Sequence, residues 1–267
     1  MLRQPAVAGY FYQGGASSLR DQVERFLIRS KDKVKAVGVM VPHAGLVYSG
    51  AVAGAVYSRI DLPGTVVLIG PNHTGMGAPV SLMPQGQWST PLGTVSIDED
   101  LAAAILGGSR LIRSDSLAHL REHSLEVQLP FIQYLREDIR IVPIQVMDTR
   151  LQTCLDVGNA VAAAIKDAKR DILVVASSDM SHYVAASVAA KQDRKAVDRV
   201  LALDAEGLYH TVQTEGITMC GFGPAIAMIT ASKALGASTA ELVKYAHSGE
   251  VSGDTDQVVG YAGVIVR

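Results

Sequence analysis

The apolar residues of this chain fall into short continuous runs, and these runs alternate with stretches of helical periodicity. A continuous apolar run is typical of a strand that is covered on both faces, as in a parallel sheet. The runs predict strands at Ala36–Val41, Thr65–Ile69, Ile139–Val146, Ile172–Ala176, Ala240–Ala246 and Val258–Val266.

Apolar residues spaced three and four apart predict helices between these strands. They are expected at Ser17–Ser30, Ser49–Ile60, Asp98–Leu106, Leu151–Ala168, Ser187–Ala202, Ala205–Thr214 and Gly223–Leu235. Ser124–Leu135 is also amphipathic, and Pro130 should begin or kink a helix there because it lacks a backbone N–H.

Glycine and proline interrupt the pattern in the first half of the chain. Short hairpin strands are expected around Val80–Met83 and Thr94–Ile97, and Ser114–Glu122 predicts a polar loop. Strands and helices otherwise alternate without a linker or repeat. The pattern predicts one α/β domain over residues 1–267, with three α/β/α layers and a mostly parallel or mixed central sheet.

Composition narrows the class of protein. Apolar residues make up 48% of the 267 residues, which excludes a disordered chain. The formal charge of −2 and the lack of a basic run argue against binding to nucleic acid. Two cysteines are too few for a disulfide framework, and neither a signal peptide nor a membrane-spanning run of about 20 residues is seen. We therefore expect a cytoplasmic globular protein.

Histidines follow three of the apolar runs within a few residues: His43, His73 and His182, the last beside Asp179. Parallel strands end at one edge of a sheet, so these side chains are expected to meet there. A single such histidine is more often structural, but several neutral imidazoles together suit a transition metal. An anionic third ligand is then needed, and the candidates are Asp179, Glu122 and Cys220.

Cys220 lies in a glycine-bearing turn before a helix, where a lowered pKa would favour a thiolate that acts as ligand or nucleophile. The alternative for Cys220 is a small buried apolar side chain. Cys154 falls on the apolar face of a helix and is expected in the core. Glu122 and His123 are expected to head a helix, where capping is an alternative role.

Other polar residues carry weaker signals. Tyr48 could present its hydroxyl at the same edge or pack against it, while His119, His210 and His247 are expected at the surface or behind the site. Ser177 and Ser178 beside Asp179 and His182 suggest a nucleophilic hydroxyl only weakly, because no oxyanion hole is recognisable. No GxSxG, Walker A, GxGxxG or HExxH motif is present.

Six motifs occur in one order along the chain: PHAGLVYSG (Pro42–Gly50), IGPNH (Ile69–His73), STPLG (Ser89–Gly93), EHSLEVQLPF (Glu122–Phe131), SSDMSHY (Ser177–Tyr183) and the Cys220-Gly221 turn. In this order they resemble the Memo family, also called AmmeMemoRadiSam system protein B in bacteria and archaea. AGYFY (Ala8–Tyr12) and VGYAG (Val259–Gly263) fit as well, so the resemblance covers essentially the whole chain.

The resemblance implies a fold similar to the class III extradiol dioxygenases, which cleave catechol rings with non-haem Fe(II). It also implies that His43 and His73 bind a metal, that Cys220 is the third ligand and that His182 is an acid/base histidine with Asp179 as its neighbour. A companion radical SAM protein is the partner that the resemblance suggests. A thiolate replaces the dioxygenases' carboxylate, so Cu or Zn would suit the site as well as Fe(II).

Three functions follow from this reading. The first is a mononuclear, iron-binding oxidoreductase with dioxygenase-like chemistry on a small substrate, whose pocket is lined by Tyr48, Asn72 and His123. The second is a zinc metallohydrolase, with His182 or Glu122 as general base. The third is a protein without catalytic activity that binds a metal, a peptide or another partner.

Overall fold

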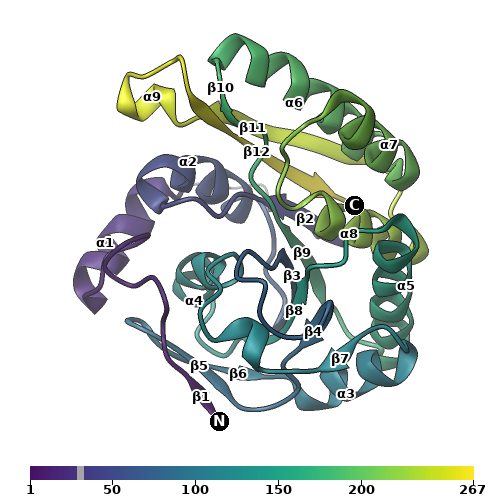
Figure 1. Cartoon of the computed structure of the whole chain (residues 1–267). Helices are drawn as coiled ribbons and strands as arrows, with labels where there is room; N and C mark the ends of the chain where they lie inside the picture. The colour runs from purple at the N-terminus through teal and green to yellow at the C-terminus, as the bar shows by residue number, and fades with distance from the viewer. Residues whose placement is uncertain (29–32) are drawn as a thin grey trace.

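The computed structural model describes residues 1–28 and 33–267 (Figure 1). The strands are β1 (Leu2–Arg3), β2 (Gly38–Val41), β3 (Thr65–Pro71), β4 (Val80–Leu82), β5 (Gln87–Thr90), β6 (Gly93–Ile97), β7 (Arg113–Ser114), β8 (Arg140–Val146), β9 (Leu173–Ser177), β10 (His182–Val184), β11 (Ala240–His247) and β12 (Val258–Val266).

The α-helices are α1 (Ala16–Phe26), α2 (Leu46–Tyr57), α3 (Glu99–Gly108), α4 (Leu129–Leu135), α5 (Leu151–Ala168), α6 (Ala186–Leu201), α7 (Ala205–Glu215), α8 (Phe222–Ala234) and α9 (Gly249–Ser252). Two 3-10 turns, η1 (Leu117–His119) and η2 (Glu126–Gln128), lie between β7 and α4. None of the helices within the described ranges has the length and apolar character that crossing a bilayer requires.

The strands form one mixed sheet in the order β1-β5-β6-β8-β3-β9-β2-β12-β10. Its centre is four adjacent parallel strands, β8, β3, β9 and β2, whose residues are buried almost throughout. β12 pairs antiparallel with β2, and β11 pairs with β12. All four central strands therefore end at one edge of the sheet, here called the carboxyl edge.

Helices cover both faces of this sheet (Figure 1). α5 and α8 pack together on one face, flanked by α3 and α7, while α2 lies on the other face with α1 and α4 beside it. At Gly54 of α2, an added Cβ would overlap the carbonyl group of Phe26, so α1 and α2 approach closely there because Gly54 lacks a side chain. The predicted three-layer α/β/α fold with a mixed sheet is confirmed.

Most predicted elements are present, and several ends differ. α2 begins at Leu46 rather than Ser49, because the chain turns into it directly after Gly45. α1 ends at Phe26, and residues 29–30 of its predicted range lie outside the described residues. α4 begins at Leu129, so Pro130 falls in its first turn, as expected for a residue that begins a helix.

Three predictions in the first half of the chain need correction. Strands are present at both predicted positions, as β4 and β6, but the hairpin joins β5 to β6, whereas β4 pairs with β7 and β8. The Ser114–Glu122 segment is not a solvated loop, because His119 and Glu122 are fully buried. Glu122 and His123 also do not head a helix, since they precede the short turn η2.

Candidate metal centre

Three imidazoles meet at the carboxyl edge. His43 follows β2 and His73 follows β3, and β9 lies between these two strands. His123 comes from the loop before η2. Each offers one ring nitrogen, and these nitrogens lie within 4.8 Å of one another. Among the described residues, no other group of three or more potential ligands from His, Cys, Asp or Glu comes this close.

The rings are packed against each other. His73 and His123 stack with their centroids 4.7 Å apart, and His43 meets both edge-on at 5.3 and 5.5 Å. His43 is only 2% exposed, whereas 35% of the His73 side chain and 23% of the His123 side chain are accessible. The cluster is therefore closed behind His43 and open to solvent beside the other two rings.

The ring of His43 is oriented by Ser177, the last residue of β9. The Ser177 hydroxyl donates its proton to the carbonyl oxygen of Ser124 at 2.6 Å, and Gln128 Nε2 donates to it at 2.9 Å. His43 Nδ1 lies 2.9 Å from the hydroxyl oxygen of Ser177. Because the proton of that hydroxyl is donated to Ser124, His43 Nδ1 is assigned as the protonated nitrogen. This assignment leaves the lone pair of His43 Nε2 facing the cluster.

Glu122 orients the other two rings. Its Oε1 lies 2.9 Å from His73 Nδ1 and 3.3 Å from His123 Nδ1. The carboxylate also accepts the backbone N–H groups of His73, His123 and Ser124. Burial acts to raise its pKa, but the hydrogen bonds and the nearby His73 outweigh burial and lower the pKa to about 2. A charged Glu122 assigns the proton of His73 to Nδ1 and leaves its Nε2 free, and the same carboxylate lies beside Nδ1 of His123.

The electrostatics keep the buried imidazoles neutral. Burial lowers the pKa of His43 well below its ordinary value, and the adjacent His123 and His73 lower it further. Burial likewise lowers the pKa of His123. Because a metal ion binds the unprotonated imidazole, both rings are in the binding form at pH 7 without losing a proton.

Cys220 lies next to His43, on the closed side of the cluster. Its Sγ lies 3.3 Å from His43 Nε2 and accepts the backbone N–H of Asp179 at 3.3 Å. Burial and then the charge of Asp179 raise the pKa of the thiol well above its ordinary value. The predicted low pKa is therefore wrong, because desolvation outweighs the following helix N-terminus. Burial therefore favours the protonated thiol in the metal-free protein.

Asp179 lies behind His43 rather than in the open part of the site. Its carboxylate accepts the backbone N–H of His43 at 2.8 Å and that of Ala44 at 3.3 Å, and one oxygen lies 4.0 Å from His43 Nε2. Burial raises the pKa of this carboxyl group. These contacts make Asp179 a residue that fixes the turn after β2.

His182 stands apart from the three clustered rings on β10. Its backbone N–H donates to Thr218 Oγ1 at 2.7 Å, and its Nδ1 lies 2.9 Å from the Thr218 carbonyl oxygen. A carbonyl oxygen only accepts, so Nδ1 carries the proton and Nε2 is free to take one. The half-exposed ring is near enough for its charge to affect the pKa values of His43 and Asp179.

Tyr48 and Asn72, the two remaining predicted pocket residues, differ in how far their side chains are held by hydrogen bonds. Tyr48 lies in the first turn of α2 and is 39% exposed. The Asn72 amide is engaged at both ends: Nδ2 donates to the Met76 carbonyl at 2.7 Å, while Oδ1 accepts from Thr74 and Gly75. These contacts build the loop after β3, and a role of Asn72 in binding substrate stays a prediction.

The sequence did not reveal the residues that orient the imidazoles. In sequence Ser177 is only a weak candidate nucleophile, but it is fully buried and donates its proton to the carbonyl oxygen of Ser124. Glu122 was considered as a ligand or base, whereas it faces the outer nitrogens of two rings. Gln128, on the apolar stretch before α4, carried no chemical signal beyond being a polar residue among apolar ones.

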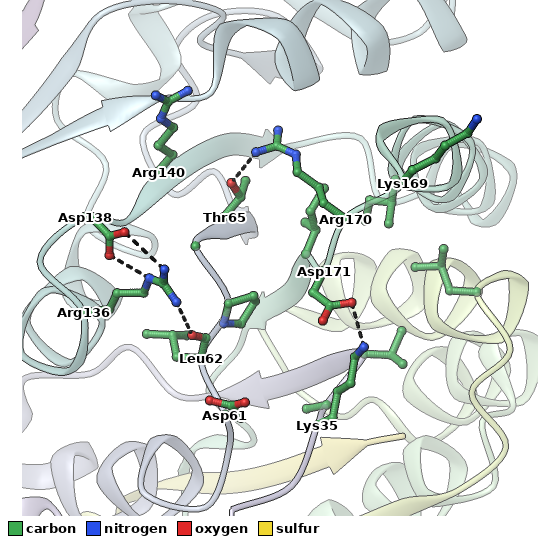
Figure 2. A pocket seen from close by; sticks show the side chains of 17 residues that line it. Lys35, Asp61, Leu62, Thr65, Arg136, Asp138, Arg140, Lys169, Arg170 and Asp171 are labelled. Carbon is green, nitrogen blue, oxygen red and sulfur yellow. Dashed lines mark hydrogen bonds and ion pairs between the residues drawn. The ribbon is translucent and has the colours of Figure 1, made fainter.

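A pocket of about 970 Å³ lies at the opposite edge of the sheet, where the central strands begin (Figure 2). Some of its charged side chains pair with one another. Arg136 donates to Asp138 at 2.8 Å, and Lys35 pairs with Asp171 at 2.7 Å on the facing wall (Figure 2). The sheet separates this pocket from the histidine cluster, so its size adds nothing to the chemistry of the carboxyl edge.

Comparison with known proteins agrees with the motifs. The Memo-like protein family model matches residues 3–265. A MEMO1 family protein of Methanothermobacter thermautotrophicus is 47% identical, with 98% of this chain and 99% of the relative covered. A MEMO1 family protein of Methanopyrus kandleri is 43% identical, with 100% and 99% covered.

A solved structure of an uncharacterized protein from Escherichia coli is similar in fold, with a TM-score of 0.56 and 13% sequence identity over 85% of this chain and 99% of that chain. At this identity it supports the α/β fold alone. The family model and the two archaeal relatives span nearly the whole chain, in agreement with the ordered motifs. The chain belongs to the Memo family.

Proposed function

We propose that this protein is a mononuclear metalloprotein whose centre is the histidine cluster, with Fe(II) as its metal and Cu or Zn as alternatives. The ligands would be His43, His73 and Cys220, with His123 as a further imidazole beside them. The observation that carries the proposal is the convergence of three imidazoles, each with one ring nitrogen within 4.8 Å of the others. Hydrogen bonds at Nδ1 of His43 and of His73 leave the Nε2 atoms of these two rings for an ion.

The donor set fits a metal ion. Ligand bonds to a zinc-like ion are about 2.0–2.1 Å for nitrogen and about 2.3 Å for sulfur. Two ligands of one ion then lie a little over 3 Å apart, and His43 Nε2 and Cys220 Sγ are separated by 3.3 Å. The charged Glu122 behind His73 and His123 matches the carboxylate that commonly supports ligating histidines.

We propose that the reaction is of an oxidoreductase or dioxygenase-like kind, on a small substrate that enters from the open side. When bound, Fe(II) would supply Lewis acidity and a one-electron redox couple. His182 would accept or return a proton at Nε2, because its Nδ1 is tied to the Thr218 carbonyl. Tyr48 would contact the substrate at the exposed rim, while Asp179 keeps the turn of His43 in place.

Hydrolysis is less well supported by the same contacts. A general base needs a pKa near the working pH, and the pKa of Glu122 is about 2. Its oxygens are also occupied by backbone and imidazole donors. A zinc hydrolase would therefore depend on His182 alone as its base.

A second candidate is a binding protein without catalysis, because large side chains are exposed around the cluster. Tyr183, which follows His182, is 74% exposed, and Tyr10, which precedes Phe11 beside His123, is 89% exposed. Tyr183 also has a left-handed backbone with φ of 57°, which is uncommon for a bulky residue. In that case Tyr183→Ser should abolish binding of a peptide or protein partner while metal binding persists.

The deciding experiment is anaerobic purification followed by metal analysis and O₂ uptake with catechols and other small phenols. We expect about one ion per chain, and loss of that ion in His73→Ala. His210→Ala, which changes an exposed histidine of α7, is the matched control and should keep the metal. A wild-type chain that binds no metal would contradict the proposed centre, and a metal-loaded chain inert toward the whole panel would contradict the oxygenase.

A further inference from the structure

Residues 1–12, here called the N-terminal arm, lie against the 119–126 loop that forms one side of the metal centre. Arg3 of the arm is 1% exposed. Its Nε donates to the carbonyl oxygen of His119 at 2.6 Å, its Nη2 to that of Glu122 at 2.7 Å, and its Nη1 to the Glu126 carboxylate at 2.7 Å. One guanidinium group therefore fixes the loop at three points along its length.

Glu126 holds the arm from the other side. Besides Arg3, its carboxylate accepts the backbone N–H groups of Ala6 at 2.7 Å and Val7 at 3.0 Å. The hydroxyl of Tyr12 donates to it at 2.6 Å, and burial together with Glu126 raises the pKa of Tyr12. The Glu126 side chain is 0% exposed, so these donors replace its hydration and hold the arm at Arg3, Ala6, Val7 and Tyr12.

The docked arm also reaches the centre itself. The ring of Phe11 packs on the ring of His123 with their centroids 4.7 Å apart. The Phe11 carbonyl oxygen accepts the backbone N–H of Leu46 at 2.7 Å, directly after the turn that carries His43. The arm therefore contacts the segments that carry two of the three imidazoles.

Thermodynamic stability alone gives little reason for this arrangement. A buried ion pair loses so much hydration that an apolar pair of similar shape is often as stable or more so. The Arg3–Glu126 pair instead contributes conformational specificity, because the hydrogen bonds of Arg3 fix the position of the 119–126 loop. That loop in turn places Glu122, which orients His73 and His123.

We propose that the N-terminal arm is a component of the metal centre, in which Arg3 and Glu126 are positioning residues that set its affinity for the metal. The inference rests on the proposed metal centre. An ion binds only the ordered arrangement of imidazoles. If the 119–126 loop relaxes in the metal-free protein, binding must reverse that relaxation, and the affinity for the ion is lower. Loss of the groups that support metal ligands typically costs about 10- to 100-fold in affinity.

The test is the affinity of the metal-free protein for Zn(II), measured by competition with a chelator. Arg3→Met should weaken binding by about tenfold or more. Arg170→Met is the matched control, because Arg170 also donates to a buried carboxylate, that of Asp98 at 2.6 Å, but lies at the opposite edge of the sheet. The control should destabilise the fold and leave the affinity within about twofold of wild type.

A folded Arg3→Met protein with wild-type affinity would overturn the inference. Should Arg3→Met not fold, Tyr12→Phe removes one donor to Glu126 and keeps the ring, and a loss of about threefold is expected. Unchanged affinity in Tyr12→Phe would then overturn the inference.

Nitrogen NMR of the imidazoles in metal-free protein gives a readout that does not depend on the ion. We expect His73 and His123 to be protonated at Nδ1 in wild type and to show mixed tautomers in Tyr12→Phe or Arg3→Met. Wild-type protein that binds no metal would refute the proposed function, and tautomers unchanged in these variants would refute the positioning role separately.

Discussion

The thiol sulfur of Cys220 lies 3.3 Å from Nε2 of His43, although 177 positions separate the two residues in the chain. Asp179 connects them, since its backbone N–H donates to the sulfur while its carboxylate accepts the His43 N–H. The contact is therefore fixed by the backbone on both sides. It places a thiol and a neutral imidazole next to each other.

Replacing Cys220 by Ser should remove a metal–sulfur bond from the centre. In Co(II)-substituted protein we expect the near-ultraviolet charge-transfer absorption of the wild type to disappear in Cys220→Ser. Cys154→Ser is the matched control, because Cys154 is fully buried in α5 and burial raises its pKa to about 12. An identical spectrum in Cys220→Ser and wild type would show that sulfur is not a ligand.

Replacing Glu122 by Gln should weaken metal binding by about 10- to 100-fold, because the charge that orients two imidazoles is lost. Isothermal titration of the metal-free protein measures the change. Glu241→Gln is a suitable control, since Glu241 pairs with Arg59 at 2.6 Å on β11 and its side chain is 40% exposed. Equal losses in the two variants would indicate a general effect of charge rather than orientation.

The buried His119 predicts a loss of stability in acid. Neither of its ring nitrogens makes a hydrogen bond within the described part of the chain, and burial followed by the nearby Arg3 lowers its pKa from the ordinary 6.5 to about 3. Between pH 6.5 and about pH 3, His119 is protonated in the unfolded chain but stays neutral in the native chain. Stability should therefore fall as the pH drops below 6.5, by up to about 1.4 kcal/mol per pH unit for this residue.

The variant His119→Phe removes this titration and keeps a ring against Trp88, whose centroid lies 5.8 Å away. Chemical denaturation of metal-free protein at pH 7 and pH 5 measures the effect. We expect the loss of unfolding free energy between these pH values to be smaller in the variant by about 1–2 kcal/mol. His43 and His123 keep their own contribution in both proteins, so an unchanged loss would exclude His119 as a source.

Gly54→Ala should destabilise the fold without affecting the centre. The added methyl group would overlap the Phe26 carbonyl, which belongs to backbone and must move with α1. Overpacking of this kind costs about 1–3 kcal/mol. Gly107→Ala is the control, because nothing lies within 4 Å of a Cβ at Gly107. Similar melting temperatures for the two variants would show that α1 shifts freely.

The parallel strands and the edge that carries the histidines could be predicted from sequence because burial on both faces leaves continuous apolar runs. β2, β3 and β9 each carry such a run, and the histidines after β2 and β3 follow directly from strand polarity. The long helix α5 matches its predicted range at both ends, since its apolar spacing is unbroken.

The 114–122 segment could not be predicted in the same way. Its polar residues suggest contact with water, but Glu122 is buried by the imidazoles and by the backbone donors around it. The Glu122 carbonyl oxygen is bound by Arg3, more than a hundred positions away. A pattern of apolar and polar residues does not show which residues far apart in the sequence will form hydrogen bonds. For the same reason the pKa of Cys220 was predicted in the wrong direction, because its burial depends on distant segments.

The pairing of β12 with β2 has a consequence for how the molecule is made. β2 is synthesised early, yet one of its two neighbours comes from the last residues of the chain, where Val264 pairs with Met40. Parallel strands and such distant partners assemble late, since long loops must close first. During synthesis the histidines of the cluster therefore emerge before the strand that completes the sheet beside β2. Binding of an ion at the proposed centre should accordingly follow completion of the fold.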